Sequence, residues 1–168
     1  NSGIGFIRQG EPFCPQIKQV VHDSMHALGF PHHDQAVYVC TEGPRLETPA
    51  EIKKFRLHGA DLVGMTLAPE TFLARELEMC YASICYLTNF AEGTFPREFK
   101  TGELFEGMQT DQEKIQVEKS ILRLPGILAG TFLNLSKTDR TCHCKNAMKR
   151  YKNKGAINED WHSWLGPE

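Results

Sequence analysis

Three short stretches of the chain carry side chains that could bind a small polar substrate. Each stretch is an apolar run that ends in small or polar residues, and these ends carry Arg45, the pair Met65-Thr66, and Asn89. Parallel strands bring their carboxyl ends to one edge of a sheet, and α/β proteins bind ligands at that edge. We therefore expect these side chains to meet at one site.

The elements that must position these residues follow from the local sequence. Strands are expected at 36–41, 62–65 and 83–87, where short runs rich in β-formers or apolar residues occur. Thr48-Pro49-Ala50-Glu51 predicts a helix start, with Thr48 as N-cap and Glu51 completing a capping box, and this helix should end before Gly59. A further helix is expected from Pro69 to near Tyr81. Strands that alternate with helices predict a parallel α/β sheet.

The remaining helices are expected on both sides of this central region. The apolar repeat predicts one helix from Pro15 to Leu28, followed by Gly29 at its C-terminus. A helix should begin at Thr110, and Pro125 should begin another. Residues 93–107 read as a loop, which is long enough to suggest an active-site lid.

Composition indicates the general class of protein. The chain has 168 residues, of which 40% are hydrophobic and 24% charged, and this predicts one soluble globular domain. The formal net charge of −2 gives no electrostatic reason to expect nucleic acid or a membrane as partner. No apolar run approaches the roughly 20 residues that span a bilayer. The six cysteines favour reduced thiols in the cytoplasm.

The central segments resemble the trimeric purine nucleoside phosphorylases, and within them the 5′-methylthioadenosine phosphorylases. The resemblance runs from about Gly10 to Gly93, and more loosely to Leu135. The matching motifs are Glu42-Gly43-Pro44-Arg45, Gly59-Ala60-Asp61, Gly64-Met65-Thr66, Pro69-Glu70, Leu73-Ala74-Arg75-Glu76 and Thr88-Asn89, with Glu11-Pro12-Phe13-Cys14-Pro15 ahead of them.

The resemblance implies a doubly wound mixed sheet flanked by helices, and a homotrimer or higher homo-oligomer. It also implies reversible cleavage of a purine nucleoside by inorganic phosphate, with phosphate as co-substrate and no organic cofactor. Residues 1–136 then form the C-terminal portion of the phosphorylase α/β domain, and residues 137–168 form a basic tail that contains tryptophan. The family's glycine-rich phosphate loop and Arg-His pair belong to an N-terminal part that this sequence lacks.

The chemistry of the matching residues suits this reaction. Cleavage needs an anion to meet the sugar cation and donors to hold the departing base. The Thr66 hydroxyl can bond phosphate, Met65 can lie against ribose, and Leu46 can cover a purine face. Asn89 is the expected catalytic residue at the base. Each residue also has an ordinary structural interpretation: Met65 as core, Thr66 and Asn89 as turn residues.

Two further interpretations concern base choice and charge. Family members that act on 6-aminopurines carry aspartates at the positions of Asn89 and Ala91, so this sequence predicts a preference for 6-oxopurines, including 5′-methylthioinosine.

Arg45 is expected to form a structural ion pair with Glu42 or Glu76. The alternatives are a methylthioadenosine phosphorylase proper, a nucleosidase in which Glu92 or Glu42 activates water, and an inactive binding or assembly module.

Cys142-His143-Cys144 is a possible metal or redox motif. A structural zinc site normally needs four ligands, and the sequence places no second cysteine pair nearby. We therefore expect no metal. His32-His33-Asp34 is expected to be a surface loop.

Overall fold

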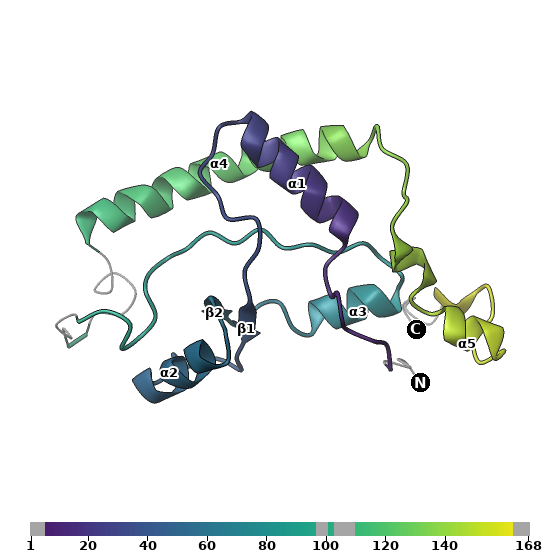
Figure 1. Ribbon diagram of the computed structural model, residues 1–168, viewed down its shortest axis with the longest axis horizontal. Coiled ribbons are helices and arrows are strands. Elements are labelled where there is room, and N and C mark those ends of the chain that lie inside the picture. The colour runs from purple at the N-terminus through teal and green to yellow at the C-terminus, as the bar shows by residue number, and fades with distance from the viewer. Residues whose placement is uncertain (1–5, 97–100, 103–109, 163–168) are drawn as a thin grey trace.

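The computed structural model describes residues 6–96, 101–102 and 110–162. In chain order its elements are α1 (Pro15–Ala27), β1 (Tyr38–Cys40), α2 (Pro49–Leu57), β2 (Leu62–Gly64), α3 (Glu70–Glu76), α4 (Asp111–Leu135), the 3-10 helix η2 (His143–Asn146) and α5 (Lys149–Asn153). Helices α1 and α4 pack together, and the two strands lie with α2 and α3 in a separate layer beneath them (Figure 1). Most of the expected lid at 93–107 falls outside the described residues.

The two strands form a parallel pair joined by α2. Tyr38 is opposite Leu62 and Cys40 is opposite Gly64. A Cβ on Gly64 would lie 2.0 Å from the Tyr38 hydroxyl oxygen, so the tyrosine ring needs the glycine backbone beneath it. The predictions of strands at 36–41 and 62–65 are confirmed, with shorter bounds.

The start of α2 confirms the predicted capping box. Thr48 accepts from the backbone N–H of Glu51, and the Glu51 carboxylate accepts from the backbone N–H of Thr48 at 2.8 Å. These bonds satisfy N–H groups that have no partner inside the helix. The helix ends before Gly59, whose φ of +83° is a conformation that glycine adopts without strain. The helix from Pro15 is likewise confirmed, with Gly29 at φ +65° after it.

Several predictions about single elements were wrong, and the described sheet is smaller than expected. Residues 83–87 pair with no strand in the described part of the chain, because isolated β-propensity yields a strand only where a neighbour supplies ladder hydrogen bonds. Helix α3 ends at Glu76, well before Tyr81. The expected mixed, doubly wound sheet is represented here by one parallel pair, and the described elements are mostly helical.

Helix α4 passes through Pro125 without ending, although the sequence predicted a new helix there. Proline removes one backbone hydrogen bond and costs about 3 kcal/mol inside a helix. The capping box of Thr110 and Glu113 and packing against α1 offset that cost. Tertiary packing therefore overrides the local signal.

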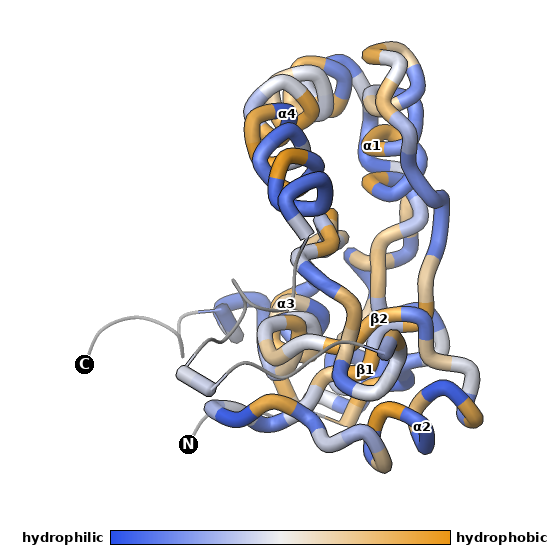
Figure 2. Tube along the Cα trace, turned by 90° about the vertical axis from the view of Figure 1, so that its left-hand side faces the viewer, coloured by the Kyte–Doolittle hydropathy of each residue, from blue (hydrophilic) through white to orange (hydrophobic). Residues whose placement is uncertain are grey.

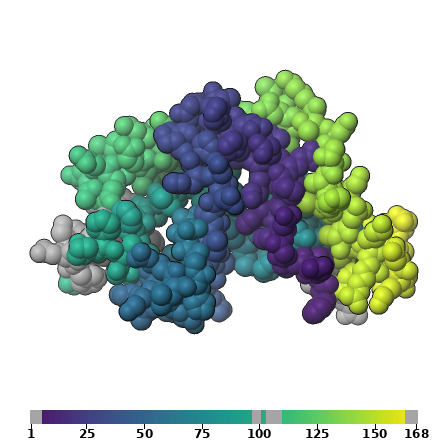
Figure 3. All heavy atoms as spheres, viewed as in Figure 1, coloured from purple at the N-terminus to yellow at the C-terminus, as the bar shows by residue number. Residues whose placement is uncertain are grey.

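The C-terminal segment docks against the N-terminal segment and the end of α3. The Tyr151 hydroxyl donates to Phe6 O at 3.0 Å, and Gln16 Nε2 donates to Asp139 O at 2.6 Å. Figure 3 shows the two segments side by side. Met148 is fully buried and Trp161 is 6% exposed, so these two residues anchor the polar C-terminal segment. Trp164 lies outside the described residues.

Large apolar side chains remain at the surface. Leu122 and Phe132 on α4 are 79% and 66% exposed, and Leu57 on α2 is 78% exposed. Figure 2 shows apolar residues along α4. Exposed apolar area on this scale is typical of surfaces that another chain or segment covers. Within the described residues, no helix combines the length and apolar character needed to cross a membrane.

Candidate active site

The ends of β1 and β2 lie next to each other. The backbone N–H of Thr41 donates to Gly64 O at 2.8 Å, which continues the parallel pairing past β1. In the following turn, a Cβ on Gly43 would lie 2.7 Å from the Met65 sulfur. Only glycine allows so close an approach, so the turn that carries Arg45 contacts Met65 directly.

The third segment lies against the start of α2. A Cβ on Gly93 would meet the Pro49 side chain at 2.6 Å, and Gly93 has a φ of +70°. Ala91 in the same segment is half-buried, as are Leu46 and Met65, while Thr66 is exposed. The structure thus joins two predicted segments through Gly43 and Met65, and it joins the third to α2.

Asn89 is half-buried and is held by its own neighbours. Its Nδ2 donates to Phe90 O at 2.9 Å, and its Oδ1 accepts from the Thr88 hydroxyl at 2.7 Å. A backbone carbonyl can only accept, so the amide nitrogen must face Phe90 and the amide oxygen must face Thr88. These contacts set the orientation of the Asn89 amide.

A buried carboxylate that the sequence interpretation missed lies beneath the first turn. Glu47 is 9% exposed and accepts a hydrogen bond from the Thr41 hydroxyl, with 2.5 Å between the oxygens. Glu47 directly precedes Thr48, the N-cap of α2, so this hydrogen bond connects the end of β1 to the start of α2. The only sequence signal was an acidic residue just before the capping box.

Arg45 forms a structural ion pair, but its partner was predicted wrongly. Its two terminal nitrogens donate to the two carboxylate oxygens of Glu51, at 2.9 and 2.6 Å, and not to Glu42 or Glu76. Glu51 is already fixed by the capping box, so its position suits a bidentate guanidinium. The hydrogen bonds from Arg45, and next those from Thr48, lower the pKa of Glu51 to about 2.

We expect Arg45→Met to raise the pKa of Glu51, but not to its ordinary value, because Thr48 still donates to the carboxylate. The folded-state pKa is lowered, so ionised Glu51 stabilises the fold above its unfolded pKa, and this contribution is lost as the pH falls towards about 2. NMR titration of the Glu51 carboxyl carbon measures the shift. Arg56→Met, which removes a guanidinium from α2, is the control, and an unchanged Glu51 pKa in Arg45→Met would contradict the assignment.

Two groups of side chains among the described residues have the spacing of metal ligands. One consists of Cys14, Cys80, Cys142 and Cys144, and the other of His22, His32 and Asp34. In the second group, His22 Nε2 lies 3.2 Å from Asp34 Oδ1, so the predicted loop at His32 is tied to α1. Neither group includes a predicted substrate residue. The first group was not predicted from the sequence, because Cys14 and Cys80 lie far along the chain from Cys142 and Cys144.

A shallow hollow of about 580 Å³ lies along α2 beside Gly93, and Pro49, Ile52, Lys53, Arg56 and Leu57 also line it. Leu46, Met65, Thr66, Asn89 and Ala91 are not among its lining residues.

Comparison with known proteins identifies the class. Residues 1–119 match the family model described as the phosphorylase superfamily. This match covers most of the chain, which therefore belongs to the phosphorylase superfamily.

The chain is also similar to curated nucleoside phosphorylases. The chain is 43% identical over 139 residues to the 6-oxopurine nucleoside phosphorylase of Pyrococcus furiosus, covering 83% of this chain and 49% of the relative. It is 41% identical over 141 residues to a Methanopyrus kandleri protein described as a probable S-methyl-5′-thioinosine phosphorylase, covering 83% and 50%. The chain spans about half the length of the curated relatives it matches.

Solved structures agree on the fold. A methylthioadenosine phosphorylase from an Antarctic soil metagenomic library superposes with a TM-score of 0.72 at 23% identity, covering 89% of this chain and 51% of that one. The methylthioadenosine phosphorylase of Schistosoma mansoni in complex with tubercidin gives a TM-score of 0.71 at 25% identity, covering 92% and 55%. The predicted resemblance to purine nucleoside and methylthioadenosine phosphorylases is confirmed.

Proposed function

We propose that this chain is the purine-binding portion of a purine nucleoside phosphorylase that prefers 6-oxopurines. The reaction transfers the sugar of a nucleoside, or of its 5′-methylthio analogue, from the base to inorganic phosphate. The products are free base and ribose 1-phosphate or 5-methylthioribose 1-phosphate. The observation that carries the proposal is the amide at Asn89, in a chain whose relatives include a 6-oxopurine nucleoside phosphorylase.

The Asn89 amide is the group that selects the base. The amide NH2 carries two hydrogens, of which one bonds Phe90 O, and in this proposal the other donates to the base. A 6-oxopurine presents an acceptor at position 6, and the imidazole nitrogen also accepts as the base leaves. Ala91 adds no polar group that would accept from a 6-amino group. The site therefore favours guanine and hypoxanthine nucleosides.

The remaining roles follow from the ends of β1 and β2. Thr66, exposed after β2, donates its hydroxyl to a phosphate oxygen, and Met65 lies against the ribose. Leu46, half-buried beside the first turn, covers the purine face. Arg45 has a structural role: its ion pair with Glu51 fixes the turn after β1, and it does not contact the substrate.

The active unit in this proposal is larger than this chain. The chain corresponds to about half of each relative, and it exposes apolar side chains on α2 and α4. We propose that further phosphorylase sequence covers these surfaces and completes the phosphate site, and that the assembly is a cytoplasmic homotrimer. Residues 1–136 supply the phosphorylase portion, and residues 137–168 are an appended segment.

A second candidate is an inactive binding or assembly module, which the half-length match favours. The protein produced from its complete reading frame separates the two candidates. With inosine, the phosphorylase releases hypoxanthine only when phosphate is present. A module releases none, and a nucleosidase releases it without phosphate.

In the same protein, we expect Thr66→Ala to lower kcat/KM for phosphate about tenfold, since one hydrogen bond to a charged oxygen is lost. Binding of hypoxanthine should change little. Initial rates over a range of phosphate concentrations measure the first effect, and calorimetry measures the second. Thr66→Ser, which keeps the hydroxyl, should retain most of the activity. Equal phosphate dependence in Thr66→Ala and wild type would remove Thr66 from the phosphate site.

A further inference from the structure

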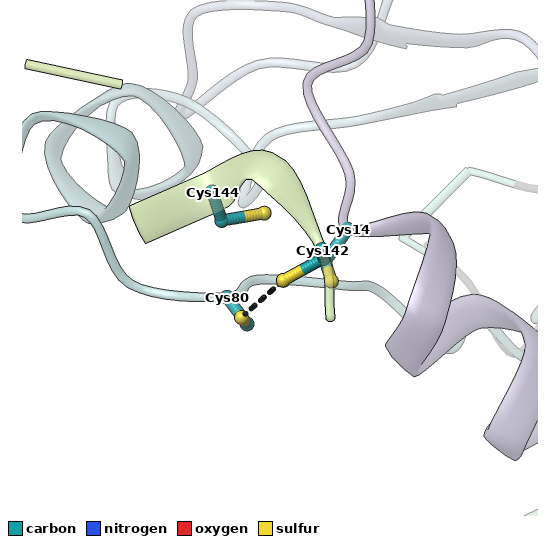
Figure 4. Close-up of side chains that lie close together, drawn as sticks. All are labelled: Cys14, Cys80, Cys142 and Cys144. Carbon is teal, nitrogen blue, oxygen red and sulfur yellow. Dashed lines mark hydrogen bonds between the residues drawn. The ribbon is translucent and has the colours of Figure 1, made fainter. Parts of the chain in front are cut away.

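Four cysteine sulfurs converge at one point on the side of the molecule away from α2. They are the sulfurs of Cys14, Cys80, Cys142 and Cys144, and all lie within 4.8 Å of one another. Figure 4 shows the side chains turned towards a common centre. All four are free thiols, and the sulfurs of Cys80 and Cys142 are 3.3 Å apart.

The four ligands come from three separate parts of the chain. Cys14 is the N-cap of α1, Cys80 follows α3, and Cys142 and Cys144 flank the start of η2. Each part is anchored independently of the sulfurs. The Cys14 backbone N–H donates to Tyr81 O at 2.7 Å, and Gln16 Oε1 accepts from the Cys142 backbone N–H at 3.2 Å. The backbone therefore holds the sulfurs close together before any metal binds.

The spacing fits a tetrahedral metal ion. Zinc–thiolate bonds of about 2.3 Å place the sulfurs of a tetrahedral site about 3.8 Å apart. The observed separations, from 3.3 Å to at most 4.8 Å, bracket that value. Small side-chain rotations are enough to reach it. Four thiolates fill every position of the tetrahedron, which is the arrangement of a structural site and leaves no place for a substrate.

Neighbouring donors suit a negatively charged centre. The backbone N–H of Cys144 and the side chain of Arg140 both lie close to the Cys142 sulfur. Arg140 also donates to Glu78 O at 2.5 Å, which fixes its guanidinium beside the cluster. A zinc ion with four thiolates carries a net charge of −2, so this cation and these N–H donors stabilise it. Cys14 and Cys142 are buried, which limits access of water to the centre.

We propose that Cys14, Cys80, Cys142 and Cys144 form a structural zinc site that fastens the C-terminal segment to α1 and α3. Zn²⁺ displaces the thiol protons to solvent and forms four zinc–sulfur bonds, with no change in oxidation state. The buried apolar residues of this region are few, chiefly Met148 and Trp161, so a metal adds stability that the packing lacks. We expected no metal from the sequence because no second cysteine pair lies near Cys142 and Cys144 along the chain. In the fold, Cys14 and Cys80 provide that second pair of ligands.

Metal content and a cobalt spectrum test the site directly. The chain is purified without an affinity tag under reducing conditions, and its zinc is measured by mass spectrometry after acid digestion. We expect one zinc per chain. After removal of zinc by a chelator, Co²⁺ should bind with one-to-one stoichiometry and give the strong visible and near-ultraviolet bands of tetrahedral cobalt–thiolate coordination, and Tm should fall until metal is restored.

Two cysteine variants provide the comparison. Cys142→Ser should weaken Co²⁺ binding at least about 100-fold, because losing a ligand costs more than the 10–100-fold of losing an outer partner. Cys85→Ser, at an exposed cysteine outside the cluster, should bind as the wild type does. If Cys142→Ser does not fold, the wild-type cobalt spectrum decides the question. Absence of thiolate bands in the reduced, folded wild type, or a mass deficit of two disulfides that persists under reduction, would overturn the proposal.

Discussion

The Asn89→Asp variant of the protein from its complete reading frame should lose its preference for inosine over adenosine. We expect the ratio of the two kcat/KM values to fall by about 10–100-fold. In the wild type, the amide nitrogen donates to Phe90 O and the amide oxygen accepts from Thr88. In the proposed site, the same nitrogen also donates to the 6-oxo group of the base. A protonated aspartate both donates to the imidazole nitrogen and accepts from a 6-amino group.

Paired assays make this prediction specific. Inosine and adenosine are compared with and without the 5′-methylthio group, so that effects at the sugar and at the base separate. Asn153→Asp makes the same chemical change at an exposed position at the end of α5 and should leave the ratio unchanged. A wild-type preference for the 6-amino member of each pair would show that Asn89 does not select 6-oxopurines.

Removal of the Glu78 carboxylate should have the largest effect on stability. Glu78 is 8% exposed, its Oε1 accepts from the Met148 backbone N–H at 3.0 Å, and its Oε2 lies 2.6 Å from Lys152 Nζ. Met148 is fully buried, so Glu78→Ala leaves its N–H without this partner and also breaks a charge-assisted hydrogen bond. We expect a loss of about 3 kcal/mol in the free energy of unfolding.

Denaturant unfolding and hydrogen exchange over residues 140–162 measure this loss. Glu78→Gln keeps an acceptor for Met148 but not the charge for Lys152, and should lie between wild type and Glu78→Ala. Both variants keep the strained φ of +55° at residue 78, so they isolate the carboxylate. Glu76→Ala removes a carboxylate two residues away and should change stability little. If Glu78→Ala were as stable as Glu76→Ala, the carboxylate would not hold the C-terminal segment.

Elements whose determinants are local were predictable from the sequence. The capping box at Thr48 and Glu51 and the glycine after α1 depend only on residues within one turn of the helix end. The strands before Met65 and after Ala36 were predicted from their apolar runs. They form in the structure because the two runs pair with each other. The same reasoning failed at Ser83–Leu87, where a strand also needs a neighbour, and at Pro125, where packing carries α4 past a residue that normally ends a helix.

Contacts between distant residues were the least predictable. Arg45 had several acidic candidates, and only the position of the capping-box glutamate makes Glu51 its partner. Cys14 and Cys80 lie close to Cys142 only because the C-terminal segment docks against α1 and α3. No periodicity in residues 137–162 predicts this docking. The predicted substrate residues Thr66 and Asn89 were singled out by motif order, because single turn residues carry little information by themselves.

Product analysis by phosphorus NMR tests the central claim most directly. The protein from its complete reading frame is incubated with inosine and phosphate, and the sugar product is identified by its phosphorus signal. A 6-oxopurine nucleoside phosphorylase converts inorganic phosphate to ribose 1-phosphate in an amount equal to the hypoxanthine released, and does so faster than with adenosine. Hypoxanthine released with inorganic phosphate unchanged, or no release from inosine at all, would contradict the proposed function.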